Sequence, residues 1–277
     1  MYSTKIIAHR GASKFAPQNT RSAFKAAVSM QADGIETDLH LTADKKLVVH
    51  HDYFIDLHSD GRGCIEFLTL AELRKFNFGS STEGQAQQET IATLAETLNI
   101  CREMQVINLE LKAALGDPEE FVSLVLEEVK LFSLDEKILF SSFDPELLEI
   151  IKRKDKKWKV GLLTEFEDSH PVIQEFALAV LARGKFPIDE EIISKIQENP
   201  SIEEQIAALS FKPEFIHPDY RSILKDESFV ERMHEQGIGV NPYTVDEKDH
   251  LTKLARLGCD GIITNRPDYA RECIYGV

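Results

Sequence analysis

The sequence has few cysteines, and their spacing matches no cysteine motif. Cys64, Cys101, Cys259 and Cys273 are the only four in 277 residues, and no two of them form a C-x-x-C pair. A chain of this length can bury a core without cross-links, so a disulfide framework or a zinc knuckle is not expected. We predict that the cysteines are reduced and structural.

The sequence also lacks a membrane segment, a signal peptide and an excess of basic residues. Its apolar runs, such as 137–140, are far too short to span a bilayer, and residues 1–8 do not form a signal peptide. The formal charge of −15 repels the phosphates of nucleic acid and anionic membranes. We therefore expect a cytoplasmic protein that binds no nucleic acid and does not insert stably into membranes; the sequence specifies no oligomeric state.

Short β-branched runs alternate with helical spacing along the chain. The eight predicted strands are Lys5–His9, Gly34–Asp38, Val106–Leu111, Ile138–Ser142, Val160–Leu163, Glu214–His217, Ile238–Asn241 and Asp260–Thr264. Helices are predicted in 19–33, where Asn19 or Thr20 caps the start and Gly34 closes the end, and in 117–131, 145–154 and 248–257. This alternation predicts an α/β fold, a (β/α)8 barrel, formed as a single domain by residues 1–277.

One segment departs from the alternation. Residues 39–52 contain two β-like arms about a turn at 42–46, which predicts a hairpin that brings His51 back to Asp38. Residues 52–89, with a short helix at 70–76, are predicted to form a small inserted lid after the second strand.

Polar residues lie at the ends of the first three major strands. Side chains two apart in a strand share a face, which groups Glu36 with Asp38, and Asn108 with Glu110 and Lys112. The composition alone predicts roughly eight acid-x-acid pairs, so only their placement at carboxyl ends of barrel strands favours a site. Three converging carboxylates would require a cation such as Mg²⁺ or Ca²⁺. On this basis alone, each residue remains equally compatible with a structural role.

Ordered motifs carry a resemblance to a known family. The chain resembles the glycerophosphodiester phosphodiesterase family in His9–Ser13, Ala16–Thr20, Asp33–Asp38, Val48–Asp52, Gly61–Gly63, Asn108–Lys112, Ser141–Phe143 and Gly258–Thr264. The similarity extends over nearly the whole chain and is weakest between Thr164 and Pro213. It implies a (β/α)8 barrel with a small insertion after the second strand.

The resemblance also assigns roles residue by residue. It implies His9 and His51 as the catalytic pair, Glu36, Asp38 and Glu110 as ligands of Mg²⁺ or Ca²⁺, Arg10 and Lys112 as phosphate-binding residues, and Tyr243 in place of a tryptophan that lines the glycerol pocket. Gln18 departs from the family pattern, where a glutamate is usual.

The implied activity is metal-dependent hydrolysis of glycerophosphodiesters to sn-glycerol 3-phosphate and an alcohol. Histidine can hold or lack a proton at neutral pH, so two histidines can supply a general acid and a general base. The alternatives are a lysophospholipase D-like phosphodiesterase and a barrel that binds a phosphorylated ligand without turnover. The sequence leaves open which histidine is the acid, whether water attacks directly or a cyclic phosphate forms first, and which head group is preferred.

Overall fold

The computed structural model describes residues 3–79, 88–112, 116–166 and 200–276. Eight parallel strands form the main sheet: β1 Lys5–His9, β2 Gly34–Leu41, β5 Val106–Leu111, β6 Ile138–Ser142, β7 Lys159–Thr164, β8 Phe215–Pro218, β9 Gly239–Val240 and β10 Gly261–Thr264. Two short strands, β3 Leu47–Val49 and β4 Ala92–Thr93, are attached to it by antiparallel pairing. All eight predicted strands are confirmed, and β9 is shorter than predicted.

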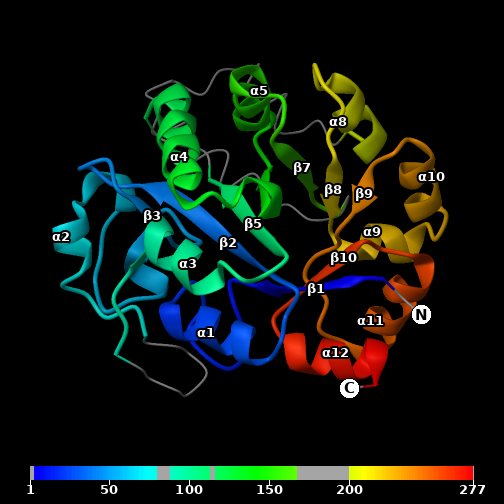
Figure 1. Ribbon diagram of the computed structural model, residues 1–277, viewed down its shortest axis with the longest axis horizontal. Coiled ribbons are helices and arrows are strands. Elements are labelled where there is room, and N and C mark those ends of the chain that lie inside the picture. Colours follow the sequence, from blue (N-terminus) through cyan, green and yellow to red (C-terminus); the bar gives the residue numbers. More distant parts are fainter. Residues whose placement is uncertain (1–2, 80–87, 113–115, 167–199, 277) are drawn as a thin grey trace.

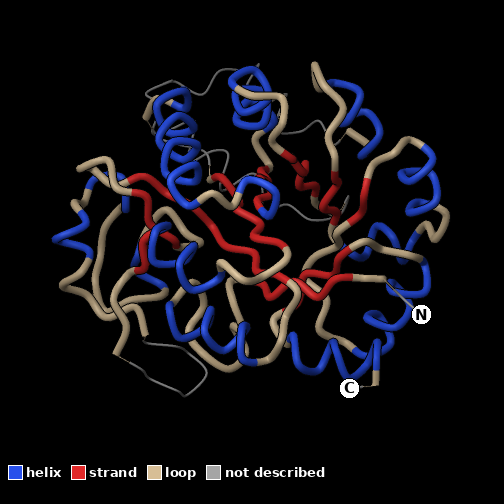
Figure 2. Tube along the Cα trace, viewed as in Figure 1, coloured by secondary structure: helices blue, strands red, loops and turns tan. Residues whose placement is uncertain are grey.

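Helices surround this sheet on the outside (Figures 1 and 2). They are α1 Arg21–Ser29, α2 Leu70–Leu73, α3 Leu94–Cys101, α4 Pro118–Phe132, α5 Pro145–Lys154, α8 Ile202–Ala208, α9 Tyr220–Lys225, α10 Phe229–Glu235, α11 Lys248–Leu257 and α12 Pro267–Tyr275. Single 3₁₀ turns occupy Ile55–Leu57, Ile65–Phe67 and Asp135–Lys137. No described helix combines the length and the apolar character needed to cross a membrane.

The strand order is β10-β1-β2-β5-β6-β7-β8-β9, so the first and last strands of the chain are neighbours. β1 and β10 pair in parallel, and Figure 1 shows them side by side in blue and red. Among the described strands no ladder joins β9 to β10, although Asp260 N donates to Val240 O at 3.0 Å and Ile263 N donates to Pro242 O at 3.0 Å. The predicted α/β barrel is confirmed, with its last junction bridged by these bonds rather than by a paired ladder.

The alternation along β2 and β5 separates core residues from site residues. Ile35, Leu39 and Leu109 belong to the main hydrophobic core. The intervening residues, Glu36 and Glu110, line a cavity instead. The strand geometry therefore turns every second side chain away from the helices and into the site.

Helix α1 confirms one sequence prediction and corrects another. Thr20 caps it by accepting a hydrogen bond from Ala23 N, as expected for one of the two candidate caps. Gly34 does not close the helix, which ends at Ser29; it is instead the first residue of β2. A Cβ on Gly34 would lie 2.4 Å from Val106 O, so glycine is needed there for the close approach of β2 and β5.

The predicted hairpin is present. Leu39 pairs with Val49 and Leu41 with Leu47, in antiparallel register. The segment that follows packs on a small second core of Val48, Ile55, Ile65, Leu73, Phe78 and Ile91. Its helix α2 is shorter than predicted, and residues 80–87 of the predicted lid lie outside the described residues. That this segment acts as a lid stays a prediction.

Candidate active site

Three buried carboxylates meet where β2 and β5 lie side by side. Glu36 and Asp38 belong to β2, and the register pairs Asp38 with Glu110 on β5. One oxygen of each carboxylate lies within 4.8 Å of the others, and all three residues are buried. This is the cluster predicted from the strand-end positions.

Two basic side chains reach these carboxylates. Lys112 Nζ lies 3.1 Å from Asp38 Oδ1 and 2.5 Å from Glu110 Oε1. Arg10 Nε lies 3.4 Å from Asp38 Oδ2, which also accepts a hydrogen bond from Asn19 Nδ2 at 2.8 Å. Burial raises the pKa of Asp38, but the charges of Lys112 and Arg10 outweigh it and hold that pKa well below its usual value. Asp38 is therefore ionised at neutral pH.

Glu36 has different surroundings. Its Oε2 accepts from the backbone N of Arg10 at 3.2 Å and lies 3.8 Å from His9 Nε2. Its buried Oε1 has no hydrogen-bond partner within the described part of the chain. Burial, and then the charges of Asp38 and Glu110, raise its pKa well above the usual value. An oxygen-preferring divalent cation fits this set, because it would give Glu36 Oε1 a partner and relieve the repulsion among the carboxylates.

His9, at the end of β1, lies beside this cluster. Its Nδ1 is 2.7 Å from Asn265 Oδ1. Burial, followed by the charge of Arg10, lowers the pKa of His9 to about 3. The ring is therefore neutral at physiological pH in the free protein.

The hairpin brings His51 to the same place. The backbone N of His50 donates to Asp38 O at 3.0 Å, and the next residue, His51, reaches the cavity. His51 Nδ1 lies 2.8 Å from Asp52 Oδ1, while Asp52 Oδ2 lies 3.3 Å from His58 Nε2. Burial, and then the charges of Lys112 and Arg10, lower the pKa of His51. The hydrogen bonds from the two histidines hold the pKa of Asp52 below its usual value although burial raises it.

These groups surround a cavity of about 210 Å³. It is lined by His9, Arg10, Glu36, His51, Asn108, Glu110, Lys112, Ser141, Phe143, Leu163, Glu165, Tyr243, Thr244 and Ile263. Tyr243 packs edge to face on Phe143 with ring centroids 6.1 Å apart, and its hydroxyl donates to Thr164 O at 3.1 Å. The structure thus places seven of the eight predicted site residues on one cavity, with Asp38 held directly behind them by Lys112 and Arg10.

Several polar contacts of the site were not predicted from the sequence. Asn19, Asn265 and Asp246 make hydrogen bonds to or next to the site residues. Gln18 accepts a hydrogen bond from Arg10 Nη1 at 2.6 Å, so the position that departs from the family pattern holds the guanidinium. Asn108 shares a strand face with Glu110, yet it had no role in the sequence interpretation.

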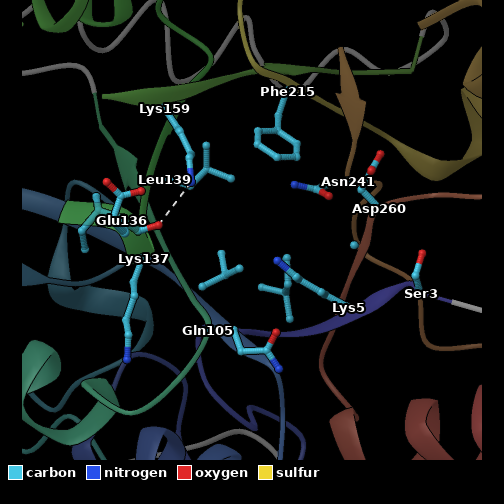
Figure 3. A pocket seen from close by; sticks show the side chains of 14 residues that line it. Ser3, Lys5, Gln105, Glu136, Lys137, Leu139, Lys159, Phe215, Asn241 and Asp260 are labelled. Carbon is cyan, nitrogen blue, oxygen red and sulfur yellow. Dashed lines mark hydrogen bonds between the residues drawn. The ribbon is translucent and has the colours of Figure 1, made fainter. Parts of the chain in front are cut away.

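A second cavity of about 190 Å³ lies at the opposite ends of the strands (Figure 3). Lys5, Phe215 and Asn241 line it, and Lys159 Nζ donates to Glu136 O at 3.2 Å on its wall. In barrels of this type the N-terminal ends of the strands serve stability, and catalysis takes place at the C-terminal ends. The first cavity, at the C-terminal ends, is therefore the candidate active site.

Comparison with known proteins shows the family of the chain. A glycerophosphodiester phosphodiesterase of Caldanaerobacter subterraneus is 29% identical over 266 residues, which cover 96% of this chain and 95% of that protein. An Oleispira antarctica phosphodiesterase, whose structure was solved in complex with the product sn-glycerol-3-phosphate, is 26% identical, with a TM-score of 0.78 over 98% of this chain and 96% of that one. A glycerophosphodiester phosphodiesterase of Thermotoga maritima is also 26% identical, with a TM-score of 0.66 over 96% of both chains. The model of the glycerophosphoryl diester phosphodiesterase family matches residues 9–269, and the chain belongs to this family.

Proposed function

We propose that this protein hydrolyses glycerophosphodiesters to sn-glycerol 3-phosphate and an alcohol, with a divalent metal ion and two histidines. The observation that carries the proposal is the cavity on which two histidines, two of the three predicted metal-binding carboxylates and two basic side chains converge. The product complex of the Oleispira antarctica relative supports the choice of substrate class.

The basic residues meet the charge of the substrate. A phosphodiester carries one negative charge, and its transition state places more on the phosphoryl oxygens. Arg10 and Lys112 are held over the cavity by their ion pairs with Asp38, so their positions are set before the substrate arrives. Preorganised charges of this kind stabilise a transition state without having to reorient.

Glu36, Asp38 and Glu110 are the residues that would hold the metal ion. When bound, Mg²⁺ or Ca²⁺ would act as a Lewis acid on a phosphoryl oxygen. The carboxylates also fix Lys112 and Arg10, so they contribute to phosphate binding through these side chains as well.

The two histidines divide the proton transfers. Asp52 lies against His51 Nδ1, and a carboxylate in this position stabilises a protonated ring. A bound phosphodiester brings negative charge beside the cations that lower the pKa of His51, which raises that pKa again. His51 is therefore assigned as the general acid that protonates the leaving oxygen. His9, neutral in its buried position, is assigned as the base that takes a proton from the attacking oxygen.

The test is release of glycerol 3-phosphate from glycerophosphocholine and glycerophosphoethanolamine, with EDTA, Mg²⁺ and Ca²⁺ arms. We expect EDTA to abolish turnover and His51→Ala to lower kcat by roughly 10²–10⁴-fold, the usual contribution of a general acid. His234→Ala, on the exposed face of α10, is the matched control and should leave turnover unchanged.

Other outcomes would contradict the proposal. Full turnover in the presence of EDTA would show that the reaction needs no metal ion. Unchanged turnover of the His51→Ala variant would show that His51 is not the general acid. Faster turnover of a lysophospholipid than of either glycerophosphodiester would favour the lysophospholipase D-like alternative. Metal binding without turnover of any diester would favour a barrel that only binds a phosphorylated ligand.

The cytoplasmic location also stays a prediction, and localisation of the tagged protein in its own cell would test it.

A further inference from the structure

The ring of His9 is held by a residue from the other end of the chain. His9 ends β1, and Asn265 follows β10 directly. The register that pairs Ala8 with Thr264 brings the next residue of each strand together. The result is a contact of 2.7 Å between His9 Nδ1 and Asn265 Oδ1, across 256 positions of sequence.

The donors and acceptors around Asn265 fix the orientation of its amide. Asn265 Nδ2 lies 2.6 Å from Asp246 Oδ2, and an ionised carboxylate only accepts hydrogen bonds. The amide nitrogen must therefore face Asp246, which leaves the amide oxygen facing His9. Ser13 Oγ also donates to this oxygen, at 2.8 Å.

Asp246 is itself held in place by two further donors. Its Oδ1 accepts from Thr264 Oγ1 at 2.9 Å and from the backbone N of Asn265 at 2.9 Å. Both oxygens of this carboxylate are thus engaged, and it has a fixed direction. A rotation of the Asn265 amide would place its oxygen against the carboxylate of Asp246, with two acceptors facing each other.

This orientation determines where the proton of the neutral His9 ring lies. The amide oxygen of Asn265 can only accept, so Nδ1 must carry the hydrogen. Nε2 then holds the lone pair. Nε2 is the nitrogen on the side of Glu36, at 3.8 Å from its carboxylate, and the ring lines the cavity.

We propose that Asn265, oriented by Asp246, is a positioning residue that holds His9 in the Nδ1–H tautomer and keeps Nε2 free to accept a proton. The proposal rests on the assignment of His9 as the base. It also explains why the two histidines have different partners. The neutral amide favours the positive ring only through its hydrogen bond and brings no charge of its own, which suits a base. The carboxylate of Asp52 adds a negative charge that favours the positive form of His51, which suits an acid.

The first test is a measurement on the wild-type protein. Nitrogen-15 NMR of protein labelled in histidine, at a pH where His9 is neutral, distinguishes protonated from unprotonated ring nitrogens. The His9→Gln variant identifies the His9 signals. We expect a protonated Nδ1 and an unprotonated Nε2; the reverse pattern in the wild-type protein would overturn the proposal whether or not the protein turns over a diester.

The second test changes the donor and the acceptor in the hydrogen bond between Asn265 and Asp246. Asp246→Asn removes the acceptor that orients the amide, so it should shift the tautomer and lower kcat about 10- to 100-fold, the usual effect of a residue that orients a functional ring. KM should change by less than about twofold, because the phosphate-binding residues stay in place. Asn265→Ala should behave in the same way, and Asn99→Ala, at an exposed position of α3, is the matched control.

The double variant Asp246→Asn, Asn265→Asp restores a donor opposite an acceptor and again presents an oxygen to His9 Nδ1. We expect it to recover the Nδ1–H position and to regain most of kcat only at higher pH, because the carboxylate introduced at position 265 raises the pKa of His9; a purely structural role predicts a double variant at least as impaired as the single ones at every pH. Unchanged kcat in Asn265→Ala would overturn the proposal. If His9→Ala kept full activity, the assignment of the base would fail instead, and the NMR pattern would still report on the contact.

Discussion

At the scale of single residues, the three carboxylates of the site differ in their partners. Asp38 and Glu110 each contact Lys112. The contacts of Glu36 are the backbone N of Arg10 and the ring of His9, which is neutral. The raised pKa of Glu36 follows from this difference and makes it the group that must lose a proton when a cation binds.

We therefore predict that binding of Mg²⁺ or Ca²⁺ releases a proton. Because the pKa of Glu36 is raised, the carboxyl holds a proton at pH values where an ordinary glutamate is ionised, and a metal ion must displace that proton. Metal affinity should then rise with pH, by up to about tenfold per unit, until the pH exceeds the pKa of Glu36. Calorimetric titration in two buffers of different ionisation enthalpy measures the proton release.

The matched variants are Glu36→Gln and Glu235→Gln, the second at an exposed position of α10. Glu36→Gln should bind the ion more weakly and without release of this proton, while Glu235→Gln should behave as the wild type. An affinity that does not change between pH 6 and 9, with no proton released, would contradict the role of Glu36 as a ligand.

Much of the site followed from single residues and their spacing, but its supporting contacts did not. Strand alternation grouped Glu36 with Asp38, and the hairpin brought His51 to them. The contacts of Asn19 and Asn265 depend on which loops meet after folding, and asparagine is common in loops of every kind. The one available signal was topological: in a barrel the first and last strands are neighbours, so a polar residue after β10 lies near His9.

At the scale of elements, the loop from β1 to α1 positions both His9 and Arg10. Arg10 has φ 56° and Gly11 has φ 80°, so the chain turns sharply through the left-handed region. A Cβ on Gly11 would lie 2.6 Å from the carbonyl carbon of Ala23. The turn thus packs directly on the backbone of α1, and Ala12 N donates to Ala23 O at 3.0 Å.

We predict that Gly11→Ala destabilises the protein by about 2–3 kcal/mol, from the left-handed conformation and the contact with Ala23 together. It should also lower kcat/KM by more than the loss of folded protein explains, because relief of the contact moves the adjacent Arg10. Urea unfolding and steady-state kinetics on the folded fraction separate the two effects. Gly116→Ala, where an added Cβ has nothing within 4 Å, is the control. Equal stability of the two variants would show that the turn can shift at no cost.

Strand positions could be predicted from the sequence better than the end of helix α1. The positions of the parallel strands were predictable because buried β-branched runs have few alternatives. The end of α1 was not, because Gly34 reads equally well as a helix stop and as a close approach between strands. Only the partner strand, β5, distinguishes these readings, and it lies about seventy residues further along.

At the scale of the whole molecule, the barrel holds four histidines whose burial disfavours the charged ring. Burial lowers the pKa of His9, His40 and His217 to about 3 and that of His50 to about 4. All four pKa values lie below the value of about 6.5 expected in the unfolded chain. At pH values between the folded and the unfolded pKa, the unfolded state binds more protons than the folded state, so the free energy of unfolding falls as the pH falls. Glu36, whose pKa is raised, acts in the opposite direction with one proton.

We predict that this linkage makes the metal-free protein acid-sensitive. Each enclosed histidine contributes a loss of at most about 2 kcal/mol between pH 6.5 and pH 5, so the net effect of about three protons approaches 6 kcal/mol. This is a large part of the 5–15 kcal/mol that typically stabilises a domain.

His217 is the position at which to test it, because it is buried beside Gly161 and Asn241, away from the catalytic groups. Urea unfolding from pH 5 to pH 8 should show a shallower pH dependence in His217→Gln, by about one proton, whatever that variant does to stability at pH 8. Asn99→Ala, which removes no titratable group from an exposed position of α3, should keep the wild-type slope. If His217→Gln kept it too, the imidazole of His217 would have to be solvated or paired when protonated, and the acid sensitivity would have to come from the other enclosed histidines.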